Sequence, residues 1–192
     1  MIDPDDLRLD LRRCLPDALR ILLADYPREA WETDPAFHGL VSFWLERHLM
    51  FRKLTELLRE DAERALDGDA DRERYGKRVG RYGGMLVGEL HGHHTIEDQH
   101  YFPVLARREP RIERGFAILD RDHKDLDGFL AAFVEAANGA IRAAESGQGF
   151  REAVAAFGGE VQRLDRLLDR HLTDEEELVV PVILRDGSRG LG

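Results

Sequence analysis

A short pattern occurs twice in this chain and restricts the folds available to it. The first copy, HHTIEDQHYFP, begins at His93 and places Glu97 four residues later; the second, HLTDEEELVVP, begins at His171 and places Glu175 in the same way. In both copies a proline follows the glutamate by six residues. Residues four apart lie about 40° apart around an α-helix, so each copy presents an imidazole and a carboxylate on one face. The pattern therefore predicts two helices that each direct this pair toward one point.

A single histidine precedes each copy at a similar distance. His48 lies 45 residues before His93, and His123 lies 48 residues before His171. Apolar residues recur at matching spacings around the two upstream histidines. The chain thus repeats one unit, a histidine followed by the His-x3-Glu pair, at an offset of 75 to 78 residues. This period is too long for a solenoid repeat and suits two helical hairpins packed in one bundle.

Helical periodicity dominates the chain, and strand signals are nearly absent. The Gly- and Pro-rich breaks predict four long helices, at about 36–66, 71–107, 111–145 and 150–185. Because short connections make neighbouring helices antiparallel, we expect an all-α, up-down-up-down four-helix bundle. Pro103 and Pro181 should each kink or end a helix one to two turns beyond the His-x3-Glu pair.

The bundle is expected to occupy residues 36–185. The segment before it, residues 1–35, contains the apolar stretch LPDALRILLADY and then a Pro- and Asp-rich stretch. It predicts a short helical N-terminal extension that covers or flanks the bundle. The Gly-rich residues 186–192 predict a flexible tail.

Charge and composition exclude several classes of partner. The net charge is −10, whereas nucleic acid and anionic membranes require a basic face. No apolar run approaches the roughly 20 residues of a membrane span, and the acidic start of the chain lacks the apolar core of a secretory signal. The single cysteine, Cys14, excludes an internal disulfide and a thiolate-bound metal cluster. We therefore expect a cytoplasmic protein.

Six residues form the candidate metal site: His48, His93, Glu97, His123, His171 and Glu175. Imidazole is a borderline ligand and carboxylate a hard one, so the mixture suits iron, manganese or zinc, and does not suit calcium or copper(I). Two carboxylates between two metals can bridge them, which leaves each metal two nitrogens and an open position for a small molecule. Burying the same six groups without a metal would be costly.

The sequence favours metal binding less strongly for the other polar residues near the pattern. The duplication separates His91, His94 and His100 from the repeated set, because none of them has a histidine at the matching position of the second copy. His91 is expected to face solvent. His100 is expected in the core or behind a ligand, with metal ligation as the alternative. Tyr82 and Glu89 lie on the same stripe and are candidate hydrogen-bond partners of the site.

With these residues the chain resembles the hemerythrin-like, HHE cation-binding family, over about residues 36–185. The matching motifs are His48, His93-x3-Glu97, His123 and His171-x3-Glu175, each pair followed by a proline. The resemblance implies a four-helix bundle around a non-haem di-iron centre that binds or reacts with O2, NO or peroxide. It also implies that the four histidines are terminal ligands, that the two glutamates bridge, and that the cofactor is two iron ions with an oxo or hydroxo bridge.

The chain departs from two branches of that family. Oxygen-carrying hemerythrins have a His-x3-His pair on the third helix, where this chain has His123-x3-Asp127. Asp127 is either a further ligand or a partner of Arg52, which occupies the matching position in the first copy. The four-His, two-Glu spacing is more similar to the nitric-oxide-responsive, iron–sulfur-cluster-repair branch. That branch usually has an N-terminal domain with adjacent cysteines, whereas this chain has only Cys14.

The sequence predicts a cytoplasmic di-iron protein that binds or senses O2 or NO, or that responds to oxidative or nitrosative stress. One alternative is a di-iron enzyme, either a peroxidase, a catalase-like protein or an NO reductase, with Tyr82, Tyr101 and His100 as candidate proton donors. Another is an iron donor in iron–sulfur cluster repair. Iron storage is disfavoured because two irons per chain is a small capacity. The sequence alone does not separate a binding protein from an enzyme, and it leaves the oligomeric state open.

Overall fold

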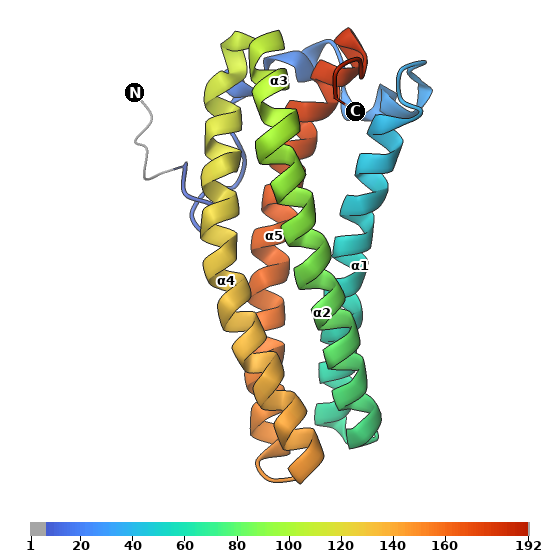
Figure 1. The fold of residues 1–192 in the computed structure, drawn as a ribbon, viewed down its shortest axis with the longest axis vertical. Helices are drawn as coiled ribbons and strands as arrows, with labels where there is room; N and C mark the ends of the chain where they lie inside the picture. The colour runs from blue at the N-terminus through green and yellow to red at the C-terminus, as the bar shows by residue number, and fades with distance from the viewer. Residues whose placement is uncertain (1–6, 192) are drawn as a thin grey trace. The chain divides into compact units, whose positions relative to one another are not determined.

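Four long α-helices make up most of the chain (Figure 1). The computed structural model describes residues 7–191, and no strand occurs among them. The helices are α1 (Leu40–Asp67), α2 (Arg72–Ile96), the short α3 (Phe102–Arg108), α4 (Glu113–Ser146) and α5 (Phe150–Asp186). The prediction of an all-α helical bundle is confirmed. No described helix combines the length and the apolar composition that crossing a membrane requires.

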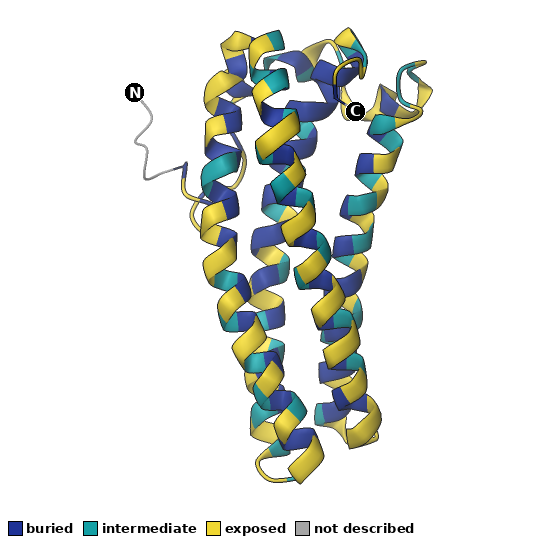
Figure 2. Ribbon diagram, in the orientation of Figure 1, coloured by how far each residue is buried: buried dark blue, intermediate teal, exposed yellow. Residues whose placement is uncertain are grey.

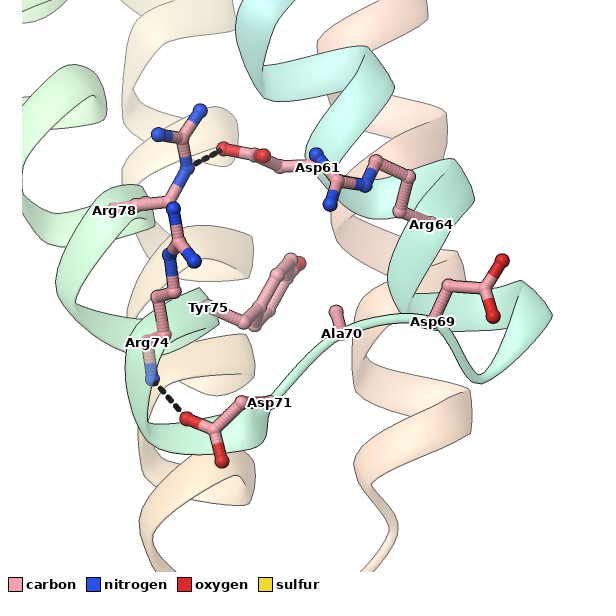
Figure 3. A pocket seen from close by; sticks show the side chains of 8 residues that line it. All are labelled: Asp61, Arg64, Asp69, Ala70, Asp71, Arg74, Tyr75 and Arg78. Atoms are coloured by element: carbon pink, nitrogen blue, oxygen red, sulfur yellow. Dashed lines mark hydrogen bonds and ion pairs between the residues drawn. The ribbon is translucent and has the colours of Figure 1, made fainter.

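Short turns with left-handed glycines connect α1 to α2 and α4 to α5. Gly68 follows α1 with φ of 85°, and Gly147 and Gly149 separate α4 from α5 with φ of 74° and 59°. Glycine adopts these angles without the steric cost that a side chain would add. Asp71 then accepts a hydrogen bond from the Arg74 backbone N–H at 2.8 Å and caps the start of α2 (Figure 3). The chain reverses at each turn, so successive long helices run antiparallel.

The chain divides into two compact units, and every long helix contributes a segment to each. Unit 1 comprises residues 1–49, 93–125 and 169–192, of which the structure describes 7–49, 93–125 and 169–191. Unit 2 comprises residues 50–92 and 126–168. Buried residues recur along one side of each helix, with exposed residues on the other (Figure 2). This pattern is the helical periodicity that the sequence predicted.

Unit 2 has an aromatic and aliphatic core. Phe133 and Phe157 are almost fully buried, and their ring centroids lie 5.4 Å apart. Arg78 of α2 donates a hydrogen bond to the Asp61 carboxylate of α1 at 2.6 Å, which joins the two helices near their turn (Figure 3). These contacts fix the helical hairpins of this unit.

The N-terminal segment contributes directly to the core of unit 1. Leu15, Leu19, Leu22 and Trp31 are all buried, and they belong to the same apolar cluster as residues of α3, α4 and α5. This segment is therefore part of the fold of unit 1.

The local conformation of the N-terminal segment differs from the α-helix expected for LPDALRILLADY. The chain forms three short 3-10 turns, Asp17–Leu19, Ile21–Ala24 and Arg28–Thr33. Pro16 precedes the first turn in an extended conformation, with ψ of 145°, and Arg20 leaves helical geometry with φ of −105° and ψ of 28°. These two breaks prevent a continuous α-helical hydrogen-bond ladder.

The predicted single helix over 71–107 is also interrupted. The α-helical geometry of α2 ends at Ile96, and Glu97–Tyr101 forms a π-helical turn before α3 begins. Pro103 lies in the first turn of α3, where its missing N–H costs no hydrogen bond. Pro181, in contrast, lies inside α5, which continues to Asp186. Pro181 therefore does not end its helix.

Two glycines of unit 2 provide a matched test of this backbone account. A methyl group at Gly68 or Gly88 would meet no atom within 4 Å, but only Gly68 has a positive φ, of 85°. Gly88→Ala should raise the free energy of unfolding by about 0.5–1 kcal/mol, because alanine favours a helix interior. Gly68→Ala should lower it by about 1–2 kcal/mol, because alanine is strained in the left-handed region. Denaturant unfolding measures both, and two changes of the same sign would contradict the account.

Candidate metal centre

The structure brings all six predicted ligands together in unit 1. α1 supplies one histidine, α2 and its π-helical turn supply a His-Glu pair, α4 supplies one histidine, and α5 supplies the second His-Glu pair. Five of these side chains are at most 5% exposed, and the sixth, His93, is 10% exposed. The duplication in the sequence therefore corresponds to one buried cluster.

The first group of candidate ligands contains His48, His93, Glu97 and Glu175, whose ligand atoms lie within 4.8 Å of one another. The Nε2 atoms of His48 and His93 are 3.1 Å apart. His93 Nε2 is 2.8 Å from Glu97 Oε1, and His48 Nε2 is 3.5 Å from Glu175 Oε2. Two nitrogens and two carboxylates thus surround one point.

A second group contains His94, His123 and His171, again with ligand atoms within 4.8 Å of one another. The carboxylates of the first group also face this second group. Glu97 Oε2 is 3.7 Å from His123 Nε2, and Glu175 Oε2 is 3.7 Å from His171 Nε2. Each carboxylate therefore faces one histidine of each group, as a bridge between two cations requires.

His94 is the residue of these groups that the sequence analysis set aside. It is buried, with its Nε2 lacking a hydrogen-bond partner among the described residues. Its ring stacks on His123, with centroids 3.9 Å apart and planes 9° apart. A ring nitrogen binds a metal in the plane of its ring, and two parallel stacked rings share no such point. In this position His94 supports His123, and it could bind the same cation only after its ring turned.

Three of the candidate ligand histidines have a carboxylate near the other ring nitrogen. His48 Nδ1 is 3.0 Å from Glu176, and His123 Nδ1 is 2.8 Å from Asp98, both at hydrogen-bond distance. His171 Nδ1 is 3.5 Å from an oxygen of Asp122 but makes no hydrogen bond with a described residue. A carboxylate at Nδ1 favours the tautomer that carries its proton there, which leaves the Nε2 lone pair free for a metal.

Sequence analysis missed these three carboxylates, although each is adjacent in sequence to a ligand. Asp98 follows Glu97, Asp122 precedes His123, and Glu176 follows Glu175. A neighbouring residue is rotated by about 100° around a helix, so it cannot reach the same point as the ligand. It can instead reach a histidine of another helix. An acidic residue next to a candidate ligand was therefore the sequence signal that could have predicted these contacts.

The cluster fits a cation because several of its carboxylate oxygens and imidazole nitrogens lack a hydrogen-bond partner. Both oxygens of Glu97 and of Glu175 are buried and make no hydrogen bond with any described residue. The same is true of the Nε2 atoms of His123 and His171. Buried polar groups without partners are costly, and carboxylates are the costliest when ionised. A bound metal supplies the missing partner for all of these atoms.

A family comparison agrees with this geometry. A family model for the hemerythrin HHE cation-binding domain matches residues 39–183. The chain belongs to this family. No curated protein and no solved structure matches the chain.

Burial controls the protonation of this hemerythrin domain when no cation is bound. It raises the pKa of Glu97 to about 8, and burial together with the charge of Glu97 raises the pKa of Glu175 well above its usual range. Burial lowers the pKa of His93 to about 4 and the pKa of His171 well below its ordinary value. Histidines that remain neutral are ready to bind a metal, whereas the two carboxyls must lose their protons to do so.

An indole N–H also faces the hemerythrin site. Trp44 is buried, its rings stand edge-on to His48 and His93, and its Nε1 has no hydrogen-bond partner among the described residues. It lies near enough to Glu97 to counteract in part the rise in the pKa of that carboxyl. Tyr101 also packs against Trp44, with ring centroids 5.1 Å apart. The site therefore has a buried hydrogen-bond donor beside its first group.

The remaining candidates of the sequence analysis lie elsewhere. His91 is exposed, as expected, but His100 is also exposed, so its assignment to the core or the ligand set is wrong. The π-helical turn accounts for this difference, because it changes the rotation of every residue after Glu97. Tyr82 and Glu89 belong to unit 2, as does Asp127, which is exposed. An Asp127–Arg52 contact stays a prediction.

The metal-free protein should lose stability as the pH rises from 6.5 to 8. Over this range the folded protein retains protons on carboxyls that the unfolded chain has already lost, since Glu97 titrates near 8 in the fold against an ordinary value of 4.5. His93 and His171, whose pKa values burial lowers, are neutral in the fold over this range. In the unfolded chain the same residues lose their remaining protons as the pH rises above about 6.5, which offsets part of the loss. We expect a loss of about 1–2 kcal/mol over this range, from a maximum of about 1.4 kcal/mol per pH unit for each proton.

Below pH 6.5, His93, His94 and His171 should oppose this trend, because burial lowers their pKa values and they take up protons only after unfolding. Denaturant unfolding of metal-free protein at several pH values measures both effects. The control is Glu97→Gln, which cannot ionise and should show a shallower loss between pH 6.5 and 8. Wild-type stability that increased over that range would contradict the assigned protonation of the buried carboxyls.

Proposed function

We propose that this hemerythrin domain binds two iron ions, one in each histidine group, with Glu97 and Glu175 as bridges. His48 and His93 would hold one iron, and His123 and His171 the other. The observation that carries the proposal is that each buried carboxylate faces one histidine of each group. The mixture of imidazole and carboxylate suits iron, and it also suits manganese or zinc, so the metal itself needs measurement.

The proposed ligand of the centre is a small molecule, O2, NO or peroxide. Bound irons would supply an open coordination position and redox chemistry for such a ligand. The protein contributes the surroundings: His93 is the most exposed of the six proposed metal ligands, at 10%, and marks the side nearest solvent. The Trp44 ring lies 6.2 Å from the His93 ring, and its N–H is a donor at the site that makes no hydrogen bond with a described residue. We propose that the protein binds or senses O2 or NO in the cytoplasm, or responds to oxidative or nitrosative stress.

The competing proposal is a di-iron enzyme that acts on peroxide or NO. Of the candidate proton donors, Tyr82 belongs to unit 2 and His100 is exposed, whereas Tyr101 packs on Trp44 at the edge of the site. Burial and the charge of Glu97 raise the pKa of Tyr101, so its hydroxyl keeps its proton at neutral pH. Tyr101 is therefore the donor to test for turnover.

Metal content should separate the roles of the ligands. We expect two metal ions per wild-type chain after anaerobic loading with Fe(II), measured by elemental analysis after desalting. His123→Ala should leave about one, because it removes a nitrogen from one group only. Glu97→Ala should weaken both sites, because its two oxygens face the two groups.

His94→Ala provides the matched control for His123→Ala, since the two rings are stacked and both are buried. It should retain both metals. A wild-type protein that folds but binds no metal would contradict the proposal. Loss of a single metal from Glu97→Ala, with the other bound at wild-type affinity, would contradict the bridging role.

Ligand binding and turnover need separate assays. The iron-loaded, reduced protein is prepared without oxygen, and a stoichiometric amount of O2 or NO is then added. The visible spectrum of the wild-type protein should change, and that of His93→Ala should not. Under the sensor proposal, added hydrogen peroxide or NO is not consumed catalytically. Repeated turnover that falls by about tenfold or more in Tyr101→Phe would favour the enzyme, given the usual contribution of a proton donor.

A further inference from the structure

Three arginines of the N-terminal segment reach acidic residues on α5. They occur at intervals of eight residues, at positions 12, 20 and 28. Arg12 Nε bonds Asp174 at 2.8 Å, Arg20 Nη1 bonds Glu177 at 2.9 Å, and Arg28 Nη1 bonds Glu176 at 2.6 Å. All of these residues belong to unit 1. The segment is therefore held on α5 by charge as well as by its buried leucines.

One of these ion pairs leads directly to a candidate ligand. Glu176 contacts both Arg28 and His48, through different oxygens: Oε2 accepts from Arg28, and Oε1 lies 3.0 Å from His48 Nδ1. The carboxylate is only 4% exposed, whereas the Arg28 side chain is 45% exposed. The arginine thus reaches from the surface to the buried carboxylate that contacts the histidine.

A second arginine leads to the other histidine group. Arg12 is almost fully buried, and its guanidinium bonds both oxygens of Asp122, one of them at 2.9 Å. Asp122 Oδ2 is in turn 3.5 Å from His171 Nδ1. Arg12 also bonds Asp174, so a single cation lies between two buried carboxylates. The two arginines therefore reach one histidine of each proposed metal.

A carboxylate at Nδ1 orients a histidine only if the carboxylate is itself held in place. An arginine bonded to that carboxylate fixes its direction, since the guanidinium is planar and its N–H groups form a fixed fork. The carboxylate then keeps the proton on Nδ1 and makes Nε2 the better metal ligand. His123 provides a contrast, because no arginine of the described chain bonds its partner Asp98.

We propose that Arg12 and Arg28 are positioning residues for the metal centre, acting through Asp122 on His171 and through Glu176 on His48. The N-terminal segment would then adjust each of the two proposed metals through one arginine. This inference rests on the proposed function, because it concerns histidines as metal ligands.

Arg20 supplies a matched control. It comes from the same segment and bonds the same helix, but its partner Glu177 contacts none of the ligand histidines. Both Arg20 and Arg28 are partly exposed, at 20% and 45%, so neither substitution leaves a cavity in the core. Each substitution removes an ion pair to α5; Arg20→Gln also removes an ion pair to Asp17, and Arg28→Gln removes a cation–π contact with Trp31. Of the two arginines, Arg28 is the one whose α5 partner contacts a candidate ligand histidine.

The test compares metal affinity with metal-free stability in the two variants. Dissociation constants come from competition with a chelator, and thermal melts of the metal-free forms measure the structural cost. Arg28→Gln should weaken one of the two bound metals by about two- to fivefold, the size of a partly exposed ion pair. Arg20→Gln should leave both constants unchanged, and the metal-free melting temperatures give the structural cost of each substitution separately.

Two further variants test the buried residues of the same contacts, Glu176 and Arg12. Glu176→Gln removes the direct partner of His48 and should weaken the same metal by about 10- to 100-fold. Arg12→Lys keeps the charge but cannot bond two carboxylates in the same way, so it should weaken the other metal. If Arg12→Lys does not fold, Arg28→Gln and Glu176→Gln still decide the proposal.

Equal metal affinities in Arg28→Gln and Arg20→Gln, with wild-type protein binding two metals, would overturn this inference and leave the proposed function intact. A change in affinity that matched an equal change in metal-free stability would also overturn it, because that result indicates a structural role only. A wild-type protein that binds no metal would overturn both proposals.

Discussion

Two buried carboxylates without partners are the central constraint on this structure. Glu97 and Glu175 are fully buried, and their four oxygens make no hydrogen bond with any described residue. Burial raises the pKa of both carboxyls, and the charge of Glu97 raises that of Glu175 further, so without a cation they hold protons at neutral pH. A bound metal reverses this preference and turns a destabilising arrangement into one that stabilises the fold. The histidines, their Nδ1 partners and the N-terminal arginines are all arranged around this pair.

Successive layers of charge surround the carboxylates. Histidines lie closest, acidic residues lie near the outer nitrogens of three of them, and arginines from the N-terminal segment bond two of those acids. The arginines compensate the charge of the acids that they bond. Compensation of this kind is what permits charged groups in a protein interior. The acidic net charge of the chain, −10, is thus consistent with a protein that buries carboxylates around a cation.

The sequence predicted the helices and the six residues at the centre because both depend on local spacing. A His-x3-Glu pair specifies its own geometry on a helix, and the duplication relates the two halves. What the sequence could not predict depends on rotation or on distant contacts. The π-helical turn at Glu97 carries His100 to the surface, and the stacking of His94 depends on where α4 places His123. Arg12 meets Asp122 and Asp174 across 110 and 162 residues, and no local pattern records such pairings.

X-ray absorption at the iron edge tests the central claim most directly, because it measures the environment of the bound metal without depending on activity. The arrangement of Glu97 and Glu175 predicts a metal–metal distance of about 3.5–4 Å, or shorter with an oxygen bridge, and a first shell of mixed nitrogen and oxygen. Spectra of the Fe(II)-loaded protein that show a second metal at this distance would support the account. Iron bound as isolated ions, with no metal scatterer within about 4 Å, would contradict it.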